Sequence, residues 1–167
     1  INNCTFINNM ANYGGSVIVD SSGGLIENCT FINNTATNSG GAIDSRFHDF
    51  TINNCTFENN RAHLDGGAVS RFKFINNCIF INNTANQWGG SISSNGRHIS
   101  VVNCTFNGSS VKYYGGAIFY LYNKGISVVN STFINNKATY GGAIYFESKL
   151  NKAVVNNCLF KENYAEY

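Results

Sequence analysis

The side chains that could bind a metal or form covalent cross-links are the six cysteines, which share one position of a repeated segment: Cys4, Cys29, Cys55, Cys78, Cys104 and Cys158. One further copy of the segment carries Ser131 there. Zinc requires a converging set of ligands, whereas a repeat places the thiols in a line. Parallel Cβ vectors on stacked repeats also suit disulfides poorly. We therefore predict a buried column of free thiols, with no metal site and no cofactor, and a disulfide-linked column is the alternative.

Basic and aromatic residues concentrate between a Gly-Gly pair and the next cysteine position. Seven of the 11 Lys and Arg residues lie there, and the segment varies from 11 positions (Gly67 to Cys78) to 16 (Gly142 to Cys158). Length variation is typical of loops on a binding face. We predict a strip that binds a glycan or a protein, formed by Arg46, Arg71, Lys73, Arg97, Tyr120 and Tyr122. Alternatively, half of the aromatic residues belong to the core and the charges only keep the surface soluble.

A second candidate site is the residue that precedes each Gly-Gly pair. It is aromatic at Tyr13, Trp88, Tyr114 and Tyr140, and polar at Ser39 and Asp65. Aromatic rings aligned on one corner form either an exposed platform for sugars or a cover over the glycine backbone. The sequence leaves both interpretations open.

The carboxylates do not form an obvious catalytic set. Hydrolysis of a glycosidic bond needs two carboxylates about 5–10 Å apart. Asp44 and Asp49 share one segment with Arg46 and His48, which we interpret as a solvated loop. His63 has no partner in register. We therefore predict no catalytic residues and a protein that is not an enzyme.

These residues are positioned by a repeat, which begins as Ile-Asn-Asn-Cys-Thr-Phe-Ile-Asn-Asn at residues 1–9 and closes with Gly14-Gly15. The double glycines recur at 14–15, 40–41, 66–67, 89–90, 115–116 and 141–142, a period of about 26 residues. Such a period indicates stacked units, none of which buries its apolar face alone. We expect residues 1–167 to form a single array that is an excerpt of a longer repeat protein.

Aligned on the cysteines, each repeat position holds one kind of side chain: β-branched three residues before, Phe two after and Ala or Val seven after. Short strands rich in Ile, Val, Phe and Thr fit this pattern. The residue before each cysteine position is Asn, which tolerates the left-handed conformation of a tight bend and can form amide ladders between stacked strands. The predicted ladder is Asn3, Asn28, Asn54, Asn77, Asn103, Asn130 and Asn157. Three strands per coil with Asn and Gly corners describe an all-β parallel β-helix of six to seven coils.

The motifs also carry a family resemblance that covers essentially the whole chain. Phe6-Ile7-Asn8-Asn9 and its copies fit F-x-x-N, and Gly40-Gly41-Ala42-Ile43 recurs at residues 115–118 and 141–144. The pairing resembles chlamydial polymorphic outer-membrane proteins and adhesin-like surface proteins of methanogenic archaea. This resemblance implies a right-handed β-helix in a secreted or surface-displayed adhesin. Ser91 and Ser109 depart from the pattern, where Ala and Asn are expected.

The composition of the chain limits the classes of partner that we expect. The chain is 43% hydrophobic and 12% charged, and its net charge of +2 is too weak to indicate nucleic acid. No apolar run approaches the roughly 18–20 residues of a membrane-spanning helix, so we expect no membrane insertion in this segment. We predict an extracellular or cell-surface adhesin-like module that binds a host or neighbouring-cell glycan or surface protein. The alternative is a structural spacer or filament subunit, with end-to-end self-association.

Overall fold

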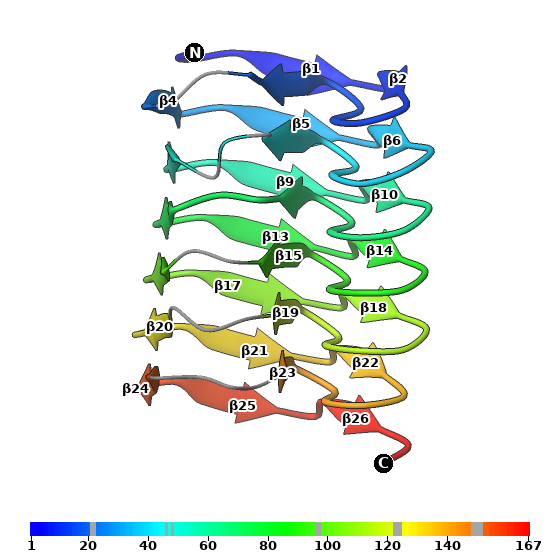
Figure 1. Cartoon of the computed structure of the whole chain (residues 1–167), viewed down its shortest axis with the longest axis vertical. Helices are drawn as coiled ribbons and strands as arrows, with labels where there is room; N and C mark the ends of the chain where they lie inside the picture. Colours follow the sequence, from blue (N-terminus) through cyan, green and yellow to red (C-terminus); the bar gives the residue numbers. More distant parts are fainter. Residues whose placement is uncertain (21–22, 46, 48, 96–97, 122–124, 148–151) are drawn as a thin grey trace.

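A computed structural model describes residues 1–20, 23–45, 47, 49–95, 98–121, 125–147 and 152–167. These residues form one parallel β-solenoid of about six turns, in which each coil stacks on the previous one (Figure 1). Every strand pair in the described part is parallel and in the register that the repeat predicts, for example Phe31 beside Phe57. The described residues include no helix that is long and apolar enough to cross a membrane.

The strands form four parallel sheets, which we number in chain order. Sheet one contains β1 (Thr5–Ile7), β5 (Thr30–Ile32), β9 (Thr56–Glu58), β13 (Ile79–Ile81), β17 (Thr105–Asn107), β21 (Thr132–Ile134) and β25 (Leu159–Lys161). Sheet two contains β2 (Met10–Ala11), β6 (Thr35–Ala36), β10 (Arg61–Ala62), β14 (Thr84–Ala85), β18 (Ser110–Val111), β22 (Lys137–Ala138) and β26 (Tyr164–Ala165).

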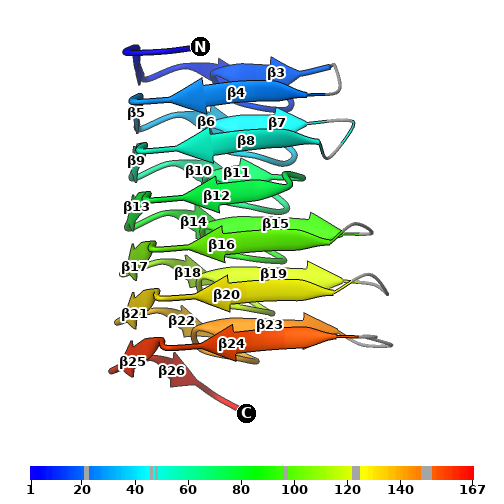
Figure 2. The ribbon, with the colours of Figure 1, turned by 90° about the vertical axis from the view of Figure 1, so that its left-hand side faces the viewer.

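The other two sheets hold the second half of each coil. In Figure 2 sheet four faces the viewer, and the strands of sheet three are visible behind it. Sheet three contains β3 (Val17–Val19), β7 (Ile43–Ser45), β11 (Val69–Ser70), β15 (Ile92–Asn95), β19 (Ile118–Leu121) and β23 (Ile144–Glu147). Sheet four contains β4 (Gly24–Glu27), β8 (Phe50–Asn53), β12 (Phe74–Asn76), β16 (Ile99–Val102), β20 (Ile126–Val129) and β24 (Ala153–Asn156).

The prediction of three strands per coil is wrong, because a further bend divides the segment after the Phe column. The bend residue adopts a left-handed conformation, with φ of 55° at Asn33 and 54° at Asn59. Asn accepts this backbone more readily than most residues. The bend separates sheet one from the two-residue strands of sheet two, so a complete coil carries four strands.

The core confirms the predicted columns. The Phe side chains of sheet one stack face to face along the whole solenoid, with neighbouring ring centroids 4.7 to 4.9 Å apart. The six cysteines are free. Each thiol donates to the carbonyl two residues earlier, as from Cys55 Sγ to Asn53 O at 3.1 Å. Ser131 makes the same bond to Val129 O at 2.9 Å, so its hydroxyl replaces a thiol without changing the pattern.

The Asn residues before the cysteine position form the predicted corner, with φ between 49° and 54° at all seven positions. Their amides are exposed and pair at some steps, as from Asn103 Nδ2 to Asn77 Oδ1 at 3.1 Å. The more regular ladder is a second, inward-facing column, four of whose members are fully buried. There, Asn34 donates from both its backbone N and its Nδ2 to Asn60 Oδ1, at 2.9 and 3.0 Å. Burial explains the regularity, because a buried amide must be hydrogen-bonded.

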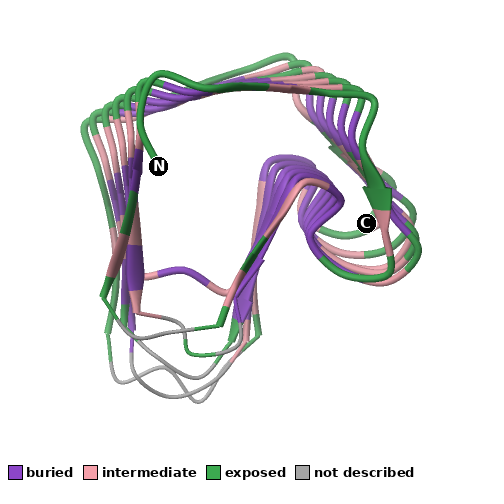
Figure 3. Ribbon diagram, turned by 90° about the horizontal axis from the view of Figure 1, so that it is seen from above, coloured by how far each residue is buried: buried purple, intermediate pink, exposed green. Residues whose placement is uncertain are grey.

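The glycine pairs allow neighbouring coils to approach closely. The first glycine of each pair has a positive φ, for example 61° at Gly66. The second needs space instead: a Cβ on Gly67 would lie 2.0 Å from the carbonyl oxygen of Gly90 in the next coil. Viewed down the solenoid (Figure 3), the buried trace of the glycine pairs folds inwards between sheets two and three. The cross-section is therefore indented at this corner.

Candidate binding groove

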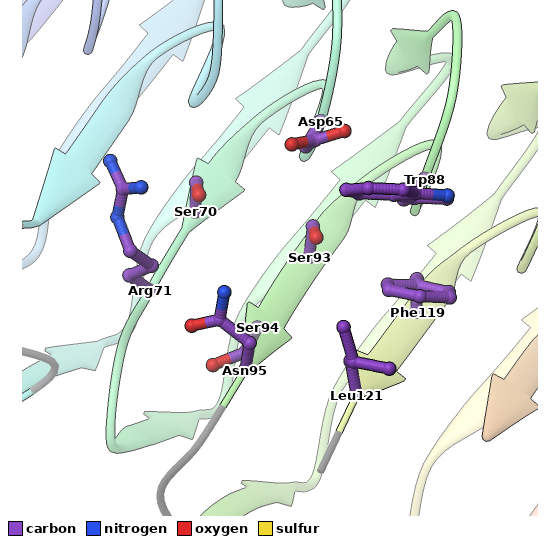
Figure 4. Close-up of a pocket in the computed structure, with 9 residues that line it drawn as sticks. All are labelled: Asp65, Ser70, Arg71, Trp88, Ser93, Ser94, Asn95, Phe119 and Leu121. Atoms are coloured by element: carbon purple, nitrogen blue, oxygen red, sulfur yellow. The ribbon is translucent and has the colours of Figure 1, made fainter. Parts of the chain in front are cut away.

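The indentation brings the residue before each glycine pair alongside the outer face of sheet three. Asp65, Trp88, Tyr114 and Tyr140 occupy successive coils at this position and are joined by parallel bridges. A hollow of about 30 Å³ opens between this row and sheet three. We call this site the corner groove (Figure 4), and the residues that line its hollow are Asp65, Ser70, Arg71, Trp88, Ser93, Ser94, Asn95, Phe119 and Leu121.

Aromatic rings dominate the groove from Trp88 towards the C-terminus. Trp88 stacks on Phe119 with ring centroids 5.3 Å apart, and Tyr114 stacks on Tyr140 at 5.1 Å. Tyr145 links both groups, 4.8 Å from Tyr114 and 5.9 Å from Phe119. Tyr140 is 37% exposed, whereas Trp88 and Tyr114 are half-buried. The row therefore has features of both interpretations: it packs over the corner and still presents ring atoms to solvent.

Towards the N-terminus the groove becomes polar, and its central contact is an ion pair between Arg71 and Asp44. Arg71 adopts a left-handed backbone with φ of 57°, and its Nε donates to Ser45 O at 2.8 Å. Its guanidinium pairs with Asp44, whose side chain is almost completely buried. Burial raises the pKa of Asp44, and Arg71 opposes that rise. The interpretation of Asp44 as part of a solvated loop is therefore wrong, because Asp44 lies in β7 under Arg71.

Asp65 holds the second carboxyl group of the groove and lies on the opposite side of Trp88 from Phe119 (Figure 4). Ser39 Oγ donates to Asp65 Oδ2 at 3.4 Å, whereas the buried Oδ1 has no hydrogen-bond partner. Burial raises the pKa of Asp65 to about 6, although Ser39 and Arg71 act in the opposite direction. A buried carboxyl oxygen without a partner disfavours the charged form, which accounts for the raised pKa of Asp65.

The described residues of the predicted basic and aromatic strip, Arg71, Lys73 and Tyr120, do not share one surface. Tyr120 faces the core with 0% exposure, so its assignment to the binding surface is wrong. Its position alternates inwards along β19, between the outward Phe119 and Leu121. Lys73 pairs with Asp49 at 2.8 Å and does not line the hollow. Of the strip's residues that the structure describes, only Arg71 lines the hollow. Arg46, Arg97 and Tyr122 lie outside the described residues.

The described residues contain no group of three or more His, Cys, Asp or Glu side chains that could hold a metal ion. Sequence reasoning named Asp65 in the corner column but missed Asp44 and Ser70, and it did not bring either of them together with Asp65 in one site. A usable signal was present: counted from the preceding glycine pair, Asp44 and Ser70 occupy the same position, which alternation places on the outer face of sheet three. The corner also folds inwards and turns this face into a groove, and no pattern in the sequence indicated that fold.

The comparison with known protein families identifies the fold. A family described as "right handed beta helix region" matches residues 1–166. The chain belongs to the right-handed β-helix family. No curated protein and no solved structure matches the chain. Right-handed β-helices occur both in enzymes such as pectate lyases and in adhesins, so membership establishes a repeat module and leaves its activity open.

Proposed function

We propose that the protein is an extracellular or cell-surface, adhesin-like binding module that holds a glycan in the corner groove. The observation that carries the proposal is the row of Trp88, Tyr114 and Tyr140 beside hydrogen-bonding groups of Ser70, Ser93 and Asn95. Rings with a few fixed polar groups are a common composition of ligand sites. The motif resemblance to adhesin-like surface proteins supports the same class and location.

The ligand best suited to this groove is an uncharged or weakly charged saccharide. Arg71, the cation of the groove's lining, is neutralised by Asp44. The Oδ1 of Asp65 is buried and has no partner, so the exposed amide of Asn95 is the group of the lining that can hydrogen-bond to a sugar hydroxyl. The groove runs along stacked coils, which suits a linear chain of sugars better than a single small molecule.

Binding is favoured over catalysis because neither carboxyl group of this corner, Asp44 or Asp65, is open to a substrate. Asp44 is almost completely buried and engaged by Arg71. The hollow of about 30 Å³ has room for little more than a water molecule between the carboxyl of Asp65 and the ring of Trp88. A sugar would therefore lie over the groove without being enclosed by it.

A glycan-array screen of the wild-type chain beside Trp88→Ala and Asn95→Ala tests the proposal. We expect selective glycan binding that both variants lose. Tyr13→Ala is the matched control, because Tyr13 occupies the same corner position three coils away from Trp88 and does not line the hollow. Binding that survives both groove substitutions contradicts the proposal. Asn95 is exposed, so its substitution separates loss of binding from loss of folding.

A structural spacer or filament subunit is the second candidate, favoured by the uninterrupted Phe stack. A continuous stack makes a stiff rod without any ligand. End-to-end self-association belongs to this candidate and would appear as a rise in mass with concentration. Absence of glycan binding by the wild-type chain, together with such a rise, would favour the spacer.

A further inference from the structure

The outer face of sheet two carries two parallel rows of polar side chains that play no part in the corner groove. In each strand the first residue points outwards and the following Ala or Val points into the core. The residue after the Ala or Val again lies at the surface. We call the space between the two rows the sheet-two trough, formed by Thr35, Arg61, Thr84, Ser110 and Lys137 in one row and Thr37, His63, Asn86, Lys112 and Thr139 in the other. The strands that carry it are stacked along one edge of Figure 1.

The trough has a net positive charge, although the carboxylate of Glu166 lies at its C-terminal end and accepts a hydrogen bond from Thr139 Oγ1 at 3.4 Å. Arg61, Lys112 and Lys137 are exposed, and none of them forms an ion pair with any acidic residue that the structure describes. Lys112 and Lys137 lie over tyrosine rings, with Nζ 4.9 Å from Tyr113 and 5.5 Å from Tyr164. These contacts hold the ammonium groups near the surface without neutralising them. Arg71 and Lys73 differ from these three cations, because each of them forms an ion pair with an aspartate.

Two shallow hollows adjoin each other along the trough and share Arg61 as a wall. One of about 340 Å³ is lined by Thr35, Ala36, Thr37, Arg61 and His63. The other, of about 300 Å³, is lined by Arg61, Thr84, Ala85, Asn86, Ser110, Val111 and Lys112. The small Ala side chains keep the floor low, and hydroxyl and amide groups alternate with the cations along both walls. Each hollow is about ten times the volume of the one in the corner groove.

We propose that the sheet-two trough is a second binding site, which takes an anionic polysaccharide lying along the solenoid. Its cations would pair with sulfate or carboxylate groups, and Thr84, Asn86 and Ser110 would hydrogen-bond to the sugar hydroxyls between them. Nucleic acid fits less well. Binding of a duplex or single strand depends on dense phosphate neutralisation or on aromatic rings open for base stacking. The trough offers about one cation per coil or fewer, which is too sparse for dense phosphate neutralisation, although Tyr113 and Tyr164 beside it are 41% and 55% exposed.

Retention on immobilised heparin and on immobilised polygalacturonate tests this site, because the first probe carries sulfate groups and the second only carboxylates. We expect the wild-type chain to bind at least one of them and elute as salt rises. Arg61→Gln with Lys112→Gln should weaken binding by about tenfold or more, because a protein with fewer cations releases fewer counterions from the polyanion when it binds. Both side chains are exposed, so the folded state is retained, and Arg61→Lys with Lys112→Arg should restore binding.

The matched control is Lys152→Gln with Lys161→Gln, which removes the same charge from exposed positions outside the trough. The proposal is overturned if this control loses as much affinity as the trough pair, if neither polyanion binds, or if a single-stranded oligonucleotide binds more tightly than both. Trp88→Ala should leave heparin and polygalacturonate binding unchanged. The trough and the corner groove can therefore fail independently.

Discussion

Ser91 and Ser109 each depart from the repeat, and their hydroxyl oxygens meet in the interior 2.6 Å apart. Ser109 replaces an Asn of the inward ladder and Ser91 replaces the Ala opposite it. Ser16 provides an internal comparison, because it stands at the position of Ser91 and the ladder position 18 residues later is Asn34. The Ser16 hydroxyl is buried and has no hydrogen-bond partner. The two departures thus compensate each other, which the sequence shows only when Ser91 of one coil is placed beside Ser109 of the next.

This pairing predicts that the effect of Ser91→Ala on stability changes sign when the residue at position 109 is changed. In the wild type it should destabilise the fold by about 1–3 kcal/mol, because the Ser109 hydroxyl is left buried and unpaired. In a Ser109→Asn background it should stabilise the fold, because a hydroxyl like that of Ser16 is removed. Urea unfolding of the four chains of this double-mutant cycle measures both effects. Equal effects in the two backgrounds would contradict the compensation.

Asp65 predicts a second effect at this scale, on pH dependence. Burial raises its folded-state pKa to about 6, above the ordinary value of 3.8. Between these values the folded state binds more protons than the unfolded state, so Asp65 contributes a stability that declines as pH rises through this window. Asp65→Asn should therefore stabilise the chain relative to wild type more at neutral pH than at pH values near 4. Unfolding midpoints at both pH values provide the measurement, and a pH-independent difference would count against the raised pKa.

At the scale of the strand and its corners, close contact with the next coil requires glycine at the second position of each pair. Gly67→Ala would place a methyl group 2.0 Å from Gly90 O, which only separation of two backbones can relieve. We expect a loss of about 3 kcal/mol or more in the free energy of unfolding. Gly24→Ala is the control, because its nearest contact would be Val19 Cγ1 at 3.4 Å, and its change should stay within about 0.5 kcal/mol. Similar losses in both variants would show that backbone entropy, not contact, makes glycine necessary.

The repeat predicted the columns, the parallel register and the Asn and Gly corners, because each depends on the residue type at one position of every coil. It did not predict the bend at Asn33 and its equivalents, since Asn-Asn is equally compatible with one bend before or after the pair. The corner groove was harder still. Asp44 and Arg71 are 27 residues apart and meet because β7 and β11 are adjacent strands, with Ser70 beside Asp44. The repeat did not indicate that the glycine corner folds inwards and places Asp65 and Trp88 along this face. Tyr120 was misassigned because inward and outward positions alternate over a segment of variable length.

At the scale of the whole solenoid, coils contact only their neighbours, so opening should proceed from the ends towards the middle. The cysteine column can report this order. Cys29 and Cys78 are both 1% exposed, and burial raises the pKa of the Cys29 thiol. Hydrogen bonding with Cys104 and Cys55 raises the pKa of the Cys78 thiol further. Since the thiolate is the reactive form, neither residue should react with a thiol reagent until its coil opens.

We therefore expect Cys29, in the second coil of this 167-residue chain, to be labelled well before Cys78, in the fourth. Peptide mass spectrometry after timed alkylation of the folded chain measures the order, and denaturation without reductant should release all six thiols. Equal labelling rates at Cys29 and Cys78 would mean that the solenoid opens as one unit. Fewer than six thiols in the denatured chain would mean that neighbouring coils are joined by disulfides. Within a solenoid whose coils open in sequence, the region from Gly66 to Phe119 is protected longest, and it contains the hollow of the corner groove.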